Sequence, residues 1–253
     1  MKKPAFVLVH GAWHGAWCWE RVTPLLQAAG HAAHAVTLTG VGERAHLLPL
    51  LGKGITLQTH IDDVLGLIQA QELDDFVLVV HSYGGMVGTG VADQIEAKLP
   101  GQRIRHLYYL DAVVPEVGES WGSAHSAAVR SSRLADAASH PHYAMSAPQA
   151  SVWGLNEADA AWVQRRMTPQ PATPYTDALH FNAQRVARIP RTYLSCTAPA
   201  SPTIDPMRAR VVSGQFWGGA WLPKSRSINM ATGHDAMVGA PQELAQLLLA
   251  CAH

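Results

Sequence analysis

The sequence predicts an α/β fold in which a six-stranded, mostly parallel sheet is covered by helices on both faces. Six short apolar runs alternate with helical patterns, and that alternation is typical of such a sheet. With 253 residues, 48% of them hydrophobic, the chain can fill a single large core. The predicted strands are 5–9, 33–38, 76–81, 105–110, 191–196 and 225–230.

Helical patterns at 19–29, 60–71, 84–99 and 241–251 fall between or after these strands. The last of them has apolar residues at the spacing of a helix that packs on a core: Leu244, Leu247, Leu248 and Cys251.

The alternation fails between residues 115 and 188, a stretch rich in Ala, Ser, His and Pro. It is too long to be a plain loop, so we expect helices of its own. It directly follows the fourth strand, and open α/β sheets bind ligands at the carboxyl ends of their strands. We therefore predict a helical cap at 115–188, inserted between core segments 1–114 and 189–253.

Composition narrows the possible partners. The 19 basic and 19 acidic residues balance, which gives no indication of a nucleic acid or a membrane surface as partner. No apolar run approaches the ~20 residues that span a bilayer. The three cysteines are scattered, and the histidines lack the paired spacing of a zinc site. We expect a soluble, cytoplasmic protein with no metal or cofactor.

The most informative motif is the run His81-Ser82-Tyr83-Gly84-Gly85, which follows the apolar strand 76–80. A strand that breaks into a glycine-flanked turn at a serine exposes the hydroxyl, as in the nucleophile elbow of serine hydrolases. We predict that Ser82 is a nucleophile. The first glycine of the usual motif is Val80 here. Either the following helix is displaced, or a small residue such as Gly85 or Gly88 makes room.

A serine hydroxyl needs a base that takes its proton and a third group that orients the base. In this kind of hydrolase the chain order is serine, acid, histidine. His234 follows the last strand and Gly233, and it is the predicted base. For the acid we favour Asp205, in the proline-rich loop after strand 191–196. Asp111, at the end of strand 105–110, is the alternative, and Asp235 is expected to face solvent.

An oxyanion hole needs preorganised N–H donors. We assign them to the backbone amides of Tyr83, next to the serine, and of Ala12, after the first strand. The small residue at Gly11 would keep that loop close to the serine. The predicted pocket residues are Trp13, Trp121, Trp153 and Phe181, with Met145 a further candidate and simple packing the alternative for each.

Four stretches, spread from end to end, carry a family resemblance: 6–19 (FVLVHGAWHGAWCW), 37–44 (TLTGVGER), 81–85 (HSYGG) and 233–234 (GH). With them the chain resembles the α/β-hydrolase family of plant methyl esterases and hydroxynitrile lyases, and still more their bacterial carboxylesterase relatives. The resemblance implies the α/β-hydrolase fold with a helical cap, often a homodimer, and a triad of Ser82, Asp205 and His234. The interval from Asp205 to His234 is similar to the family's acid-to-histidine spacing.

Within that family, the plant cyanohydrin lyases carry a threonine where this chain has Gly11. They also carry a lysine after the catalytic histidine, where this chain has Asp235, whose negative charge would oppose an anionic leaving group. Both differences favour ester hydrolysis. The main hypothesis is a serine carboxylesterase that hydrolyses small, largely apolar esters through an acyl-enzyme on Ser82. The alternatives are C–C cleavage of the hydroxynitrile lyase type without an acyl-enzyme, and a non-catalytic ligand receptor on a hydrolase scaffold.

Overall fold

The computed structural model describes residues 3–201 and 203–250, and its centre is a six-stranded sheet in the order β2-β1-β3-β4-β7-β8. Every neighbouring pair in this sheet is parallel, which confirms the predicted fold class. Each strand begins and ends within two residues of its predicted run. The strands are β1 (Ala5–Val9), β2 (Ala33–Val36), β3 (Asp75–His81), β4 (Arg103–Leu110), β7 (Arg191–Cys196) and β8 (Ser225–Met230).

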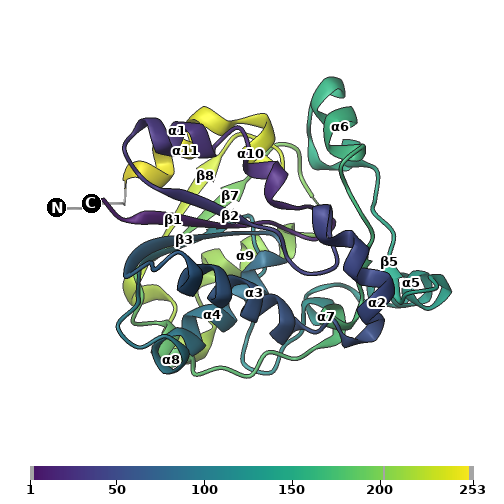
Figure 1. Ribbon diagram of the computed structural model, residues 1–253, viewed down its shortest axis with the longest axis horizontal. Helices are drawn as coiled ribbons and strands as arrows, with labels where there is room; N and C mark the ends of the chain where they lie inside the picture. The colour runs from purple at the N-terminus through teal and green to yellow at the C-terminus, as the bar shows by residue number, and fades with distance from the viewer. Residues whose placement is uncertain (1–2, 202, 251–253) are drawn as a thin grey trace.

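Helices cover both faces of the sheet (Figure 1). Helices α1 and α11 pack together on one face, and α3 and α4 pack together on the other. The α-helices outside the inserted segment are α1 (Thr23–Ala28), α2 (Leu48–Leu51), α3 (Leu57–Ala70), α4 (Gly84–Lys98), α9 (Asp205–Ser213), α10 (Ala236–Gly239) and α11 (Pro241–Ala250). The 3₁₀ turns there are η1 (Ala16–Trp19), η2 (Gly42–Leu47), η3 (Gly52–Gly54), η6 (Trp217–Gly219) and η7 (Leu222–Lys224).

The predicted apolar stripe of the last helix is present in α11, where Leu244 and Leu248 are fully buried. Cys251, its last predicted member, lies outside the described residues. The other two cysteines, Cys18 and Cys196, are buried free thiols. Among the helices that the structure describes, none has both the length and the apolar character needed to cross a membrane.

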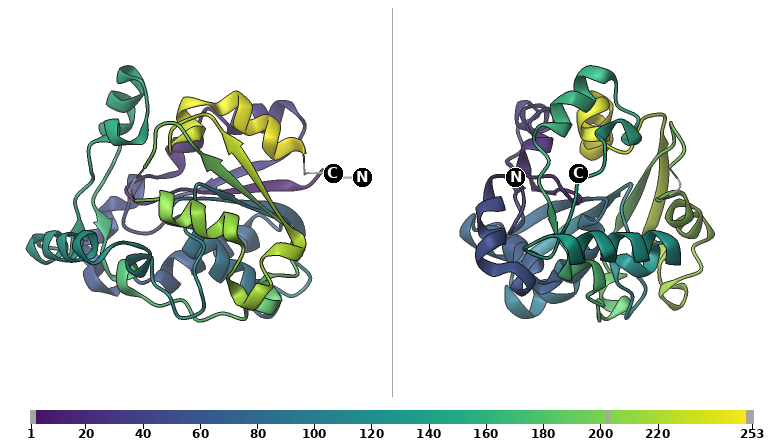
Figure 2. Two further views of the ribbon diagram at one scale, coloured as in Figure 1. Left: turned by 180° about the vertical axis from the view of Figure 1, so that it is seen from behind. Right: turned by 90° about the vertical axis from the view of Figure 1, so that its right-hand side faces the viewer.

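Most of the inserted segment, including α5 and α6, lies beyond the carboxyl ends of the strands (Figures 1 and 2). Seen from that side, α5 and α6 lie in front of the sheet (Figure 2, right). The last helix of the segment, α8, packs against α4 of the core instead. Its elements are η4 (Trp121–Ala124), α5 (Ala127–Ser139), β5 (Ala144–Met145), η5 (Ala150–Trp153), α6 (Glu157–Gln164), β6 (Gln170–Pro171), α7 (Thr173–Thr176) and α8 (Ala183–Val186).

The register of the sheet brings three loops to one point. Val9 pairs with Val80, and His81 pairs with Leu110, so β1, β3 and β4 end side by side. The residues that follow these strands therefore leave the sheet as neighbours at its carboxyl edge, where open α/β sheets bind ligands.

Val80 fits the sharp turn because α4 offers no side chain opposite it. A Cβ added at Gly88 would lie 2.4 Å from Val80 Cγ1, far closer than packed carbon atoms approach. Of the two glycines expected to compensate for Val80, Gly88 is the one that faces it. Gly85 lies instead against the backbone of Val113.

Candidate active site

Ser82 stands on a strained turn between β3 and α4. Its φ is +53°, a left-handed conformation that non-glycine residues seldom adopt and that clusters at functional sites. Backbone hydrogen bonds hold it there: its N–H donates to Leu110 O (3.2 Å), and its carbonyl accepts from Gly85 N (3.0 Å) and Val113 N (2.9 Å). These contacts fix the predicted strand–turn–helix geometry at the serine.

His234 reaches the serine from the loop after β8. Its Nε2 lies 3.0 Å from Ser82 Oγ, within hydrogen-bonding distance. The backbone of His234 is held on both sides, because its N–H donates to Trp153 O (2.9 Å) and its carbonyl accepts from His81 Nε2 (3.0 Å). The predicted pairing of Ser82 with His234 is therefore present in the structure.

The carboxylate that contacts His234 belongs to Asp111. Asp111 Oδ2 lies 2.7 Å from His234 Nδ1, and the residue is completely buried. Asp111 follows β4 directly and, like Ser82, has a positive φ, +45°. The preferred placement of Asp205 beside the histidine is wrong, and the alternative considered from the sequence, Asp111, occupies that position.

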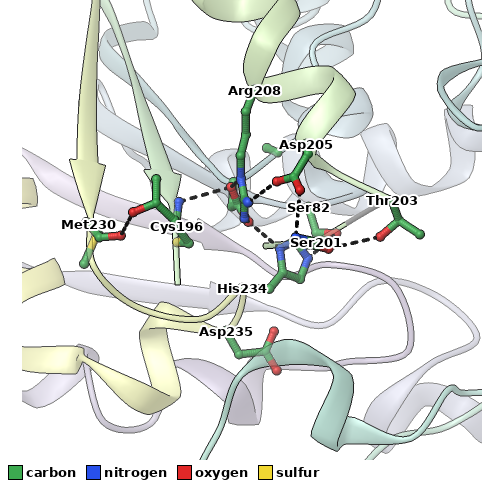
Figure 3. A network of polar contacts seen from close by, with 12 residues as sticks. Ser82, Cys196, Ser201, Thr203, Asp205, Arg208, Met230, His234 and Asp235 are labelled. Atoms are coloured by element: carbon green, nitrogen blue, oxygen red, sulfur yellow. Dashed lines mark hydrogen bonds and ion pairs between the residues drawn. The ribbon is translucent and has the colours of Figure 1, made fainter. Parts of the chain in front are cut away.

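The Asp205 side chain does not contact His234, because Asp205 is the first residue of helix α9 and its carboxylate binds other groups. Its Oδ2 accepts from Ser201 N (2.9 Å), and its other oxygen pairs with Arg208 one turn later on the same helix (2.5 Å). Its side chain is 41% exposed. Figure 3 shows Asp205 and Arg208 together on α9 above His234.

Arg208 joins Asp205 to the buried acid. Its Nε donates to Asp111 Oδ1 (2.7 Å) and a terminal nitrogen donates to Oδ2 (2.5 Å), a two-pronged geometry that favours the ionised carboxylate. Burial alone would raise the pKa of Asp111, but the hydrogen bonds from His234 and Arg208 outweigh it and hold the pKa below its ordinary value. Asp111 therefore stays charged beside His234.

The loop after β1 lies against the serine. A Cβ added at Gly11 would come within 2.8 Å of Ser82 Cβ and 2.9 Å of His81 Nδ1. His10 fixes this loop: its Nδ1 donates to Gly11 O (2.7 Å), while its Nε2 accepts from Leu38 N (3.0 Å). With one ring nitrogen donating and the other accepting, His10 is neutral, and burial lowers its pKa to about 3.

Because the close approach at Gly11 sets the position of Ala12, Gly11→Ala is expected to lower kcat for an activated ester by about 10²-fold or more. The added methyl would push the loop away from Ser82. The matched control is Gly66→Ala on α3, where a Cβ meets no atom within 4 Å and activity should stay unchanged. Normal activity of Gly11→Ala would show that catalysis does not depend on the close approach of this loop to Ser82.

Behind His234 lies a buried ion pair between His14 and Asp235. His14 Nδ1 lies 2.7 Å from Ala12 O, and its Nε2 lies 3.2 Å from Asp235 Oδ2. Both partners are acceptors, so each ring nitrogen must carry a hydrogen and the ring is an imidazolium. Burial opposes that charge, but the Asp235 carboxylate and the hydrogen bonds raise the pKa of His14 above its ordinary value.

The prediction that Asp235 faces solvent is wrong, because the residue is completely buried. In Figure 3 it lies on the opposite side of His234 from Arg208. Its carboxylate pairs with His14, and it is not among the residues that line the cavity at Ser82. Its charge therefore does not face a leaving group in that cavity, and Asp235 does not distinguish ester hydrolysis from lyase chemistry. The pair instead ties Ala12 to the loop that carries His234.

One carboxylate and two imidazoles lie close enough together to suggest a metal: single ligand atoms of His81, His234 and Asp235 are all within 4.8 Å of one another. However, both ring nitrogens of His234 are already hydrogen-bonded, to Ser82 and to Asp111. An ion bound here would have to break one of these bonds, so the arrangement fits the serine–histidine chemistry better than a metal site.

A cavity of about 110 Å³ opens onto Ser82 and His234. Three of the predicted pocket residues line it, Trp13, Trp121 and Trp153. The Trp13 ring contacts the other two, with its centroid 5.8 Å from that of Trp121 and 6.3 Å from that of Trp153. This is a small aromatic pocket, below the ~300 Å³ typical of sites for drug-sized ligands.

The other two predicted pocket residues lie elsewhere. Phe181 packs edge-to-face on Trp217, with ring centroids 5.6 Å apart. Met145 is buried in β5, where its carbonyl accepts from Trp13 Nε1 (3.1 Å). Sequence reasoning missed several residues that do line the cavity, among them His125, Arg133 and Met207.

A serine–histidine–aspartate chain at the carboxyl edge of a parallel sheet, beneath an inserted helical segment, defines a hydrolase of the α/β class. The chain belongs to the alpha/beta hydrolase family, because the sequence model of that family matches residues 6–247.

Similar proteins span the whole chain. A carbendazim hydrolyzing esterase from Nocardioides sp. (strain SG-4G) is 41% identical, covering 97% of this chain and 98% of its own length. Methylesterase 7 of Arabidopsis thaliana is 25% identical, covering 96% and 94%. The solved structure of an extracellular alpha/beta-hydrolase from a Paenibacillus species has a TM-score of 0.78 at 23% identity, covering 98% of both chains.

Proposed function

We infer that this protein is a serine carboxylesterase. The observation that carries the proposal is the continuous chain of hydrogen bonds from Ser82 through His234 to the buried Asp111. This is the arrangement that turns a weakly nucleophilic hydroxyl into a reactive one. The similarity to esterases over nearly the whole chain supports the same reaction.

In this proposal Ser82 Oγ attacks the ester carbonyl while His234 Nε2 takes its proton. His234 then protonates the departing alkoxide, which leaves an acyl group on Ser82. Water, activated by His234 in the same way, hydrolyses the acyl-enzyme. Asp111 holds the histidine with Nδ1 protonated and stabilises the imidazolium that forms in both steps.

The backbone amides of Ala12 and Tyr83 are the proposed oxyanion hole. Support for Ala12 comes from the tight contact of Gly11 with Ser82. Tyr83 immediately precedes α4, whose N-terminal end favours negative charge. Its side chain is anchored, since the hydroxyl lies 2.9 Å from His60 Nδ1.

For the substrate, we propose small, largely apolar esters, and we propose that segment 115–188 acts as the cap. Support comes from the small cavity and from the two tryptophans that this segment contributes to its wall, Trp121 and Trp153. Because the relative at 41% identity hydrolyses carbendazim, that compound is a candidate substrate, and its loss can be followed by chromatography. Location in the cytoplasm and assembly as a homodimer stay predictions.

The proposal is tested with p-nitrophenyl acetate and butyrate. Ser82→Ala is expected to lower kcat by at least ~10³-fold, the scale for removing a triad member. The control is Ser131→Ala, an exposed serine on α5, which should be fully active. Equal rates for wild type and Ser82→Ala would refute the serine mechanism. A wild type that binds these esters without turnover would favour a receptor.

A further inference from the structure

The cap contributes a cation to the wall of the catalytic pocket. Arg133, on α5, lines the same cavity as Ser82 and His234, and it is partly buried. Its guanidinium carbon lies 4.7 Å from the centroid of the Trp13 ring, which flanks the predicted oxyanion residue Ala12. The described residues that line this cavity include no carboxylate.

Arg133 differs from most of the other described arginines that are withdrawn from solvent. Arg208 binds two carboxylates, and Arg44 pairs with Asp63. The buried Arg191 donates to four backbone carbonyls. In each case the protein itself supplies oxygen acceptors for the guanidinium. Arg166 resembles Arg133, with one hydrogen bond to Trp162 O (3.2 Å) and a guanidinium over the Trp162 ring, but Arg166 does not line the cavity at Ser82.

For Arg133, the only hydrogen bond among the described residues is one long contact from a terminal nitrogen to Ser146 O (3.4 Å). The nearest acid on its own helix, Asp136, is turned to Ser146, whose N–H and hydroxyl it accepts at 2.7 and 3.0 Å. A guanidinium has five N–H donors in a fork that matches a carboxylate. Burial without a matching acid lowers the pKa of Arg133, which still leaves it charged at neutral pH.

We propose that Arg133 determines substrate preference by binding a carboxylate that the ester carries away from its scissile bond. This inference rests on the proposed esterase function and narrows its small, largely apolar esters to those that also carry one anionic group, such as half-esters. The aromatic walls would hold the apolar part of the substrate, and the guanidinium would pair with the acid. A guanidinium that only packs on Trp13 would give no such preference.

The test compares charged and neutral esters of equal length. On the acyl side these are mono-p-nitrophenyl adipate, pimelate and suberate against the p-nitrophenyl alkanoates of the same chain length. On the alcohol side they are 4-acetoxybenzoate against 4-methylphenyl acetate. The quantity measured is the ratio of kcat/KM for the charged ester to that for its neutral partner. Because this ratio is compared between protein variants, any difference in intrinsic reactivity between the two esters cancels.

In Arg133→Met, which keeps a long side chain over Trp13, this ratio is expected to fall at least ~10-fold for one or more pairs, the scale of one charge-assisted hydrogen bond. Arg133→Lys, which keeps the charge without the fork, should give an intermediate ratio. Arg130→Met is the control, because Arg130 is exposed on the same helix one turn away. Unchanged ratios for every pair in Arg133→Met would overturn the proposal.

A second measurement does not depend on turnover. Adipate, suberate and 4-hydroxybenzoate are titrated against tryptophan fluorescence, and each Kd is compared between wild type and Arg133→Met. Weaker binding by at least ~10-fold in the variant supports the carboxylate site even if no ester is hydrolysed. Equal Kd values for all three acids, or no binding to the wild type, would refute the site. Absence of turnover together with Arg133-dependent binding would refute only the esterase proposal.

Discussion

Replacing Asp111 with asparagine is expected to lower kcat/KM for p-nitrophenyl butyrate by about 10⁴-fold, the scale for a triad acid that loses its charge. The amide can no longer hold His234 in the correct tautomer or stabilise its imidazolium. Asp111→Asn also leaves the buried Arg208 without its main carboxylate partner, so the variant should be less stable. Activity is therefore compared at a temperature where circular dichroism shows both proteins folded.

Asp205→Asn is the matched control, because it removes the same charge from the other acid that binds Arg208. Its side chain is 41% exposed and touches neither Ser82 nor His234 among the described contacts. We expect its kcat/KM to stay within about tenfold of wild type, since Asp111 still holds Arg208. The opposite result, a large loss for Asp205→Asn with Asp111→Asn active, would restore Asp205 as the acid.

Removing one partner of the His14–Asp235 ion pair is expected to lower the free energy of unfolding by about 3–5 kcal/mol, because an uncompensated charge would remain buried. His14→Gln and Asp235→Asn should each show this loss in urea denaturation, and the double variant should lose less than the sum of the two. The control is Lys98→Met, which breaks an exposed ion pair with Asp62 and should cost no more than about 1 kcal/mol.

The stability that the His14–Asp235 pair contributes depends on pH, and the directions of the two pKa shifts determine how. The folded-state pKa of His14 is raised, so its contribution to stability is fully present below its ordinary value of 6.5 and is lost as pH rises through the raised value. The pKa of Asp235 is depressed, so its contribution is present above 3.8 and is lost in acid. The stability difference between wild type and His14→Gln should therefore be larger at pH 5 than at pH 9. A difference that grows toward pH 9 would show that His14 is neutral.

The six strands and helices α1, α3, α4 and α11 were predictable from the sequence because each is specified locally, whereas α2, α9 and α10 were not predicted. The apolar runs of β1, β3 and β4 form strands that are buried over most of their length, and α11 shows its helical stripe within ten residues. Ser82 was identified for the same reason, since the strand, the turn and the helix that expose it are contiguous in the chain.

Which aspartate contacts His234 depends on the spatial distance between side chains that are far apart in the chain. Local sequence patterns carry no information about that distance. Asp205 has a family-like spacing to His234, but spacing does not say where a side chain points. The adjacent proline and the Arg208 one turn later make Asp205 the start of α9. A signal for Asp111 was present: it directly follows the strand next to the serine strand, so parallel pairing had to bring it beside Ser82.

By itself, the sequence determined the parallel sheet and the strand ends that carry Ser82 and His234, because each of these follows from a short pattern along the chain. A cap at 115–188 stays a prediction. Only the tertiary structure decided which carboxylate meets His234, that His14 and Asp235 form a buried ion pair, and that Arg133 reaches the pocket. The first two outcomes join residues more than a hundred positions apart, and the third brings Arg133 to Trp13 near the start of the chain. Whether such a charged side chain has a partner within the protein depends on how deeply it is buried and on where it points. Both are set only when the sheet, the helices and the inserted segment pack together.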